Sequence, residues 1–96
     1  MRELTMGERR NIAEAANGWK MEIYTNSEQP ISKEKEDRIE QMAKAYTTSY
    51  LDYYKNAVAA AADGKVNAVA VANAFNEMYK KEHPDFFDMD ALIKEV

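Results

Sequence analysis

The sequence of 96 residues contains no cysteine, only three glycines and two prolines, and no long apolar run. The absence of cysteine excludes disulfides, thiolate metal sites and thiol nucleophiles. No apolar stretch approaches the roughly 18 residues of a membrane-spanning helix, and the first ten residues lack the apolar core of a signal peptide. We therefore expect a cytoplasmic protein that has no membrane partner and is held together by packing alone.

Few glycines and prolines, with abundant alanine, glutamate and lysine, predict a single all-α domain over residues 1–96. A chain this short buries only about 60–65% of the surface that its unfolded form exposes. The large apolar residues are few, with three leucines beside six methionines and fifteen alanines. Because a partner subunit can supply the stability that a thin core lacks, we expect a homodimer.

Capping residues and apolar periodicity predict three main helices and a short C-terminal helix packed as a small bundle. The predicted helices span about residues 6–24, 33–62, 67–82 and 88–95. The predicted capping residues at their starts are Thr5, Ser32, Asn67 and Asp88. Gly64 and Pro84 are the predicted stops of the second and third helices.

Residues 19–25 fit two secondary structures. Ile12, Ala16, Trp19 and Ile23 follow each other at helical spacing and form one apolar face. Asn17-Gly18, however, is a good helix stop, and "WKMEIYT" alternates as a strand paired across a homodimer would. We prefer a helix, because the chain has no second strand-like run and an outward-facing Gly18 costs roughly 1 kcal/mol.

The stretch "AYTTSYLDYY" holds four of the six tyrosines, on a second helix whose apolar face is roughly 200° wide. Such a face must contact two helices, or one helix and another chain. We interpret the tyrosines first as core and alternatively as an interface with a second copy or a partner, since a core must satisfy four hydroxyls. The candidate interface residues are Tyr46, Tyr50, Tyr53 and Tyr54. A base-stacking platform would need a basic groove, which is missing.

Alanine is dense on both sides of the turn between the second and third helices. Small side chains let helix axes approach closely, so we expect a tight helical hairpin there. The side chains that the third helix should bury are Ala68, Val71, Ala72, Phe75, Met78 and Tyr79.

The C-terminal segment carries the net charge of −4, because residues 1–81 hold twelve basic and twelve acidic side chains and residues 82–96 hold one and five. Alternating acidic and apolar groups are typical of short docking segments. The candidate acidic docking residues are Asp85, Phe86, Phe87, Asp88 and Asp90. Alternatively, Phe86, Phe87, Leu92 and Ile93 close the open end of the bundle while the aspartates cap and solvate helices.

The sequence offers no catalytic, cofactor-binding or metal-binding pattern. It has one histidine, no glycine-rich phosphate loop and no calcium-loop glycine among Asp85, Asp88 and Asp90. The charged run of residues 32–40 is interpreted as a solvated helix face. Nucleic acid is not an expected partner, since the chain is acidic and its third helix has no arginine.

These observations favour a non-catalytic interaction module that binds and modulates or inhibits another protein through aromatic and acidic helical surfaces. Its size suits a small bacterial or phage accessory factor, and the identity of the protein partner is open. A scaffolding homo-oligomer is the alternative hypothesis, and a helical DNA-binding regulator is the third.

Overall fold

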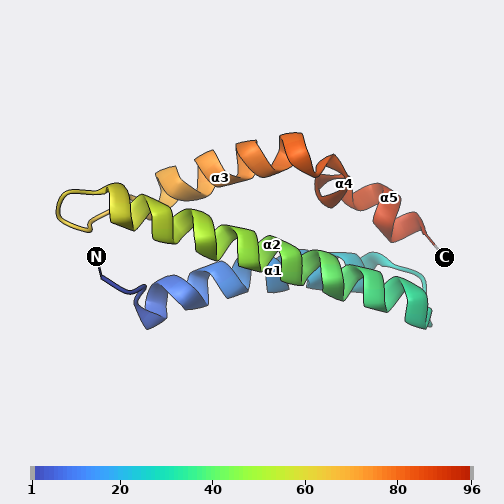
Figure 1. Ribbon diagram of the computed structural model, residues 1–96. Helices are drawn as coiled ribbons and strands as arrows, with labels where there is room; N and C mark the ends of the chain where they lie inside the picture. Colours follow the sequence, from blue (N-terminus) through green and yellow to red (C-terminus); the bar gives the residue numbers. More distant parts are fainter. Residues whose placement is uncertain (1, 96) are drawn as a thin grey trace.

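A computed structural model describes residues 2–95, and within this range the protein is all-α with no strand, as predicted (Figure 1). Three long helices run antiparallel to their neighbours in the chain, and two short helices follow at the C-terminal end. The molecule is elongated and thin, with extents of 49 × 26 × 18 Å. The helices are α1 (Met6–Asn26), α2 (Lys33–Ala60), α3 (Ala68–Glu82), α4 (Pro84–Phe87) and α5 (Met89–Lys94).

The predicted capping residues begin the helices. Thr5 Oγ1 accepts a hydrogen bond from the Glu8 amide at 3.1 Å, and Glu8 Oε1 accepts one from the Thr5 amide at 2.8 Å, which completes a capping box. The Ser32 and Asn67 side chains accept in the same way at the starts of α2 and α3. Side-chain acceptors thus satisfy amides that a helix cannot pair internally.

Residues 19–25 are helical, so the strand alternative is wrong. The helix α1 passes through Gly18 without a break, and its buried residues are the predicted Ile12, Ala16, Trp19 and Ile23. A Cβ atom added at Gly18 would meet no atom within 4 Å, which places this glycine on the outer surface. The helical periodicity of the apolar side chains therefore outweighs the local stop signal.

The structure differs from the predicted helices at two places. The helix α2 ends at Ala60, and the left-handed Gly64 (φ +70°) lies in the following loop instead of capping the helix. The predicted C-terminal helix corresponds to α5, capped by Asp88 as predicted, and an unpredicted one-turn helix, α4, starts at Pro84 before it. Proline is well suited to a first helical position, where its missing N–H leaves no bond unmade.

The N-terminal segment ties α1 to the loop between α2 and α3. Arg2 Nε donates to the Gly64 carbonyl at 2.9 Å, and the same guanidinium donates to both carboxylate oxygens of Glu8 at 2.7 and 2.9 Å. Leu4, two residues after Arg2 in the chain, is buried in the core. One end of the molecule is thus closed by contacts across 62 residues of chain.

The Arg2–Glu8 ion pair makes the free energy of unfolding depend on pH. Hydrogen bonds from Arg2 lower the pKa of Glu8 to about 2, below its value in an unfolded chain. Stability from this carboxylate is therefore present above about pH 4.5 and is lost as the pH falls towards 2. Urea unfolding should show wild type more stable than Glu8→Gln at pH 6, with the difference gone near pH 2. A difference that is constant across this range would contradict the assignment.

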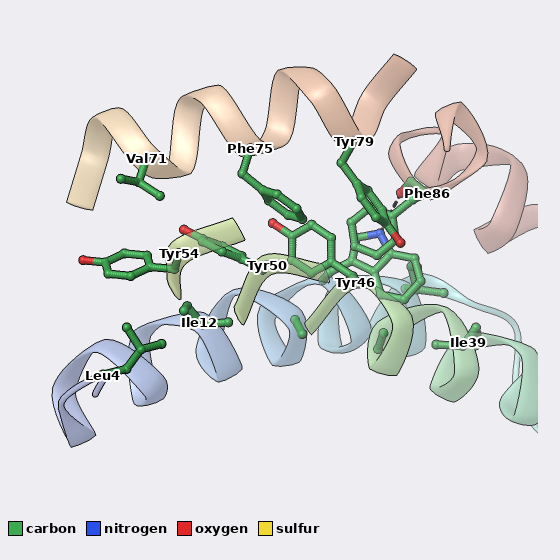
Figure 2. Packing of buried hydrophobic residues seen from close by; sticks show 14 of the residues in the cluster. Leu4, Ile12, Ile39, Tyr46, Tyr50, Tyr54, Val71, Phe75, Tyr79 and Phe86 are labelled. Atoms are coloured by element: carbon green, nitrogen blue, oxygen red, sulfur yellow. Dashed lines mark hydrogen bonds between the residues drawn. The ribbon is translucent and has the colours of Figure 1, made fainter. Parts of the chain in front are cut away.

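The broad apolar face of α2 contacts both α1 and α3, which is one of the two predicted arrangements. The predicted tight alanine hairpin is wrong. Aromatic rings fill the space between α2 and α3 (Figure 2), and the backbones of these two helices approach over much less of their length than those of α1 and α2. Phe75 is fully buried between these helices, whereas Ala68 and Met78, predicted as core, are exposed.

Candidate functional site

Three of the four tyrosines of "AYTTSYLDYY" lie inside the chain. Tyr46, Tyr50 and Tyr54 are 4–7% exposed, and Tyr53 is half-buried. The Tyr46 hydroxyl donates to Asn76 Oδ1 at 2.7 Å, and burial raises the pKa of Tyr46 to about 12. Figure 2 shows the Tyr50 and Tyr54 hydroxyls pointing towards the end of the core where Leu4 and Val71 lie. Among these residues, Tyr53 is the one whose ring remains accessible to another chain.

The candidate docking tail divides into a buried and an exposed set. The Phe86 ring is stacked between Trp19 and Tyr46, with centroid distances of 4.2 and 4.4 Å. Trp19 Nε1 also donates to the Phe86 carbonyl at 2.8 Å. Phe87 is half-buried, and the exposed members are Asp85, Asp88 and Asp90. Phe86 therefore anchors the tail and is unavailable to a partner, while the carboxylates face solvent.

The interpretation of residues 32–40 as a solvated face is wrong at Lys35, which is buried. Only 2% of this residue is exposed. Its Nζ donates to Ser27 Oγ at 3.0 Å and to the carbonyls of Ile93 and Glu95 at 3.1 and 2.7 Å. The signal was in the sequence, because Lys35 lies one helical turn before the buried Ile39 on the same face.

A surface groove that the sequence did not reveal lies where α1, the end of α3 and the α4–α5 segment meet. It has a volume of about 540 Å³. We call it the Trp19 groove, and its lining residues are Ala15, Gly18, Trp19, Glu22, Tyr46, Asn76, Phe86, Phe87 and Met89. The lining combines four aromatic side chains with small residues on α1 and a single charged group, Glu22.

A second depression, of about 600 Å³, lies between the α1–α2 loop and the end of α5. It contains Lys35, but all three N–H donors of that ammonium already have acceptors within the protein. The Trp19 groove is therefore the better candidate for binding, because its lining is mostly apolar and includes the half-buried Phe87 and Met89.

Within residues 2–95, no group of three or more histidine and acidic side chains is placed to hold a metal ion. No helix among the described residues is both long and apolar enough to cross a membrane. Comparison of the chain with protein-family models, with curated proteins and with solved structures gave no match.

Proposed function

We propose that this chain is a non-catalytic protein-interaction module that binds an apolar helical segment of a partner protein in the Trp19 groove. The observation that carries the proposal is the lining of this groove, where the half-buried Phe87 and Met89 lie beside the small residues of α1 and the largely buried Trp19 forms the floor. Aromatic residues and methionine are enriched at the centres of protein interfaces, where they supply large contact areas.

The groove is held open in advance. Trp19 is fixed by its hydrogen bond to the Phe86 carbonyl and by the stacking of the two rings. Tyr46 is fixed beside them by its hydrogen bond to Asn76. Because these side chains are already ordered, a ligand loses little of its binding free energy to ordering them.

The arrangement of the long helices favours a helical ligand. Both α1 and α3 pack on α2, and the rings of the core fill the space between them (Figure 2). A helix laid along the groove would take the fourth place that a four-helix bundle fills. Ala15 and Gly18 lie three residues apart on the α1 side, where small side chains allow close approach. Covering a helix of a partner in this way would modulate or inhibit that partner.

Selection from a displayed library of helical peptides tests this function. Enriched peptides should bind wild type and lose at least tenfold in affinity for Gly18→Phe, which places a ring in the groove. Nothing within 4 Å opposes a new side chain at Gly18, so this variant should fold. Met21→Phe is the matched control, because Met21 is 61% exposed on α1 and does not line the groove. Failure to enrich any peptide, or equal binding to Gly18→Phe, would overturn the proposal.

A further inference from the structure

The end of the Trp19 groove that α4 and α5 form is acidic. Phe87 and Met89 belong to the segment of residues 82–96, which has five acidic side chains against Lys94 alone. Extending the segment back to residue 77 adds Glu77, Lys80 and Lys81 and still leaves six acidic against three basic groups. The chain segment that forms this end of the groove thus carries a net negative charge.

The carboxylates near the groove are exposed, and those described form no ion pairs. Glu22 lines the groove and is exposed, as are the three aspartates of the tail. None of the four forms an ion pair with another residue in the part of the chain that the structure describes. Asp85 and Asp88 line a separate depression, together with Ala91, Leu92, Lys94 and Glu95. Asp85 precedes Phe86 directly in the chain, and Asp88 and Asp90 flank Met89, so these charges lie close to the groove on the scale of about 8–10 Å over which charges act at physiological ionic strength.

We propose that the segment bound in the Trp19 groove is an amphipathic helix of a partner protein with lysine or arginine flanking its apolar face. This inference rests on the proposed function and specifies its partner. A ligand with basic flanks gains attraction from the acidic end of the groove, whereas acidic flanks meet like charge. The apolar face of the helix covers Trp19, Phe87 and Met89, and its basic flank lies over Glu22 and the tail aspartates.

Two synthetic helical peptides with the same leucine face and without tryptophan test the inference, one flanked by lysine and the other by glutamate. Trp19 is the single tryptophan of the chain, so its fluorescence reports binding at the groove itself. At physiological salt the lysine peptide should bind at least tenfold more tightly, and high salt should reduce this preference. Binding of the lysine peptide should be lost in Gly18→Phe.

A triple variant separates charge from structure. Asp85→Asn, Asp88→Asn and Asp90→Asn together should lower the preference for the lysine peptide below threefold. Asparagine at position 88 keeps an acceptor for the Ala91 amide, so α5 retains its cap. The matched control is Glu3→Gln, Asp52→Asn and Asp63→Asn, which removes three exposed carboxylates outside the groove and should leave the preference unchanged.

The outcomes separate the two proposals. Equal binding of both peptides, sensitive to Gly18→Phe, would overturn the charge inference and leave the groove as a binding site. Binding of neither peptide would overturn both. Binding of the lysine peptide to Gly18→Phe as tightly as to wild type would place it elsewhere on the surface and overturn the inference. A dimer in light scattering that Gly18→Phe dissociates would make a second copy the occupant and would likewise overturn it.

Discussion

Replacing Phe86 by alanine should lower the free energy of unfolding by about 3–5 kcal/mol, a large part of the ~5–15 kcal/mol that stabilises a typical domain. The ring is 4% exposed and stacked between Trp19 and Tyr46. Its removal leaves a cavity where three aromatic side chains meet and also weakens the attachment of α4. Urea unfolding followed by far-UV circular dichroism measures the change.

Phe87→Ala is the control for this prediction, since it removes the same ring from the adjacent, half-buried position. We expect a loss of about 1 kcal/mol there, because less apolar surface is uncovered. Phe86→Leu should recover much of the loss by refilling the volume. If the two alanine variants were equally stable, the central place of Phe86 in the core would be refuted.

The all-α class and the helix starts were predictable because they depend on local chemistry. Thr5 and Glu8 stand three residues apart and form the capping box that this spacing predicts. The buried stripe of α1 likewise follows from 3.6-residue periodicity, which a solvent-exposed Gly18 does not interrupt. In each case the partners lie within one or two turns, so the sequence alone brings them together.

The Trp19 groove was not predictable because residues distant in the chain form it. Trp19 and Phe86 are 67 positions apart, and only the folded chain places the indole N–H against the Phe86 carbonyl. The exposure of Met78 was missed for a related reason. Its apolar character suited the core, but α3 rests on the rings of Phe75 and Tyr79, and this leaves Met78 at the edge. The size of these rings sets the position of α3, and a pattern of apolar residues does not encode that size.

Lys35→Met should release the C-terminal helix α5 from the rest of the molecule. The ammonium of Lys35 bridges Ser27 in the α1–α2 loop to the carbonyls of Ile93 and Glu95, which have no further helical turn to bond them. Methionine fills the buried volume without donating, so these acceptors lose their donor at a cost of about 1–3 kcal/mol. Methionine also removes the desolvation cost of burying a charged ammonium, and this offsets part of the loss.

Hydrogen exchange at the amides of α5 measures this release, because it detects local opening that global unfolding conceals. Protection in α5 should fall by at least tenfold in Lys35→Met, while the middle of α2 stays protected. The Arg38–Glu95 ion pair is the remaining link and should keep α5 partly folded. Lys33→Met is the control, since that side chain is 80% exposed and pairs only with Asp37 among the described residues. Unchanged protection of α5 in Lys35→Met would show that Leu92 and the ion pair suffice to hold the helix, and that the buried ammonium contributes no attachment of its own.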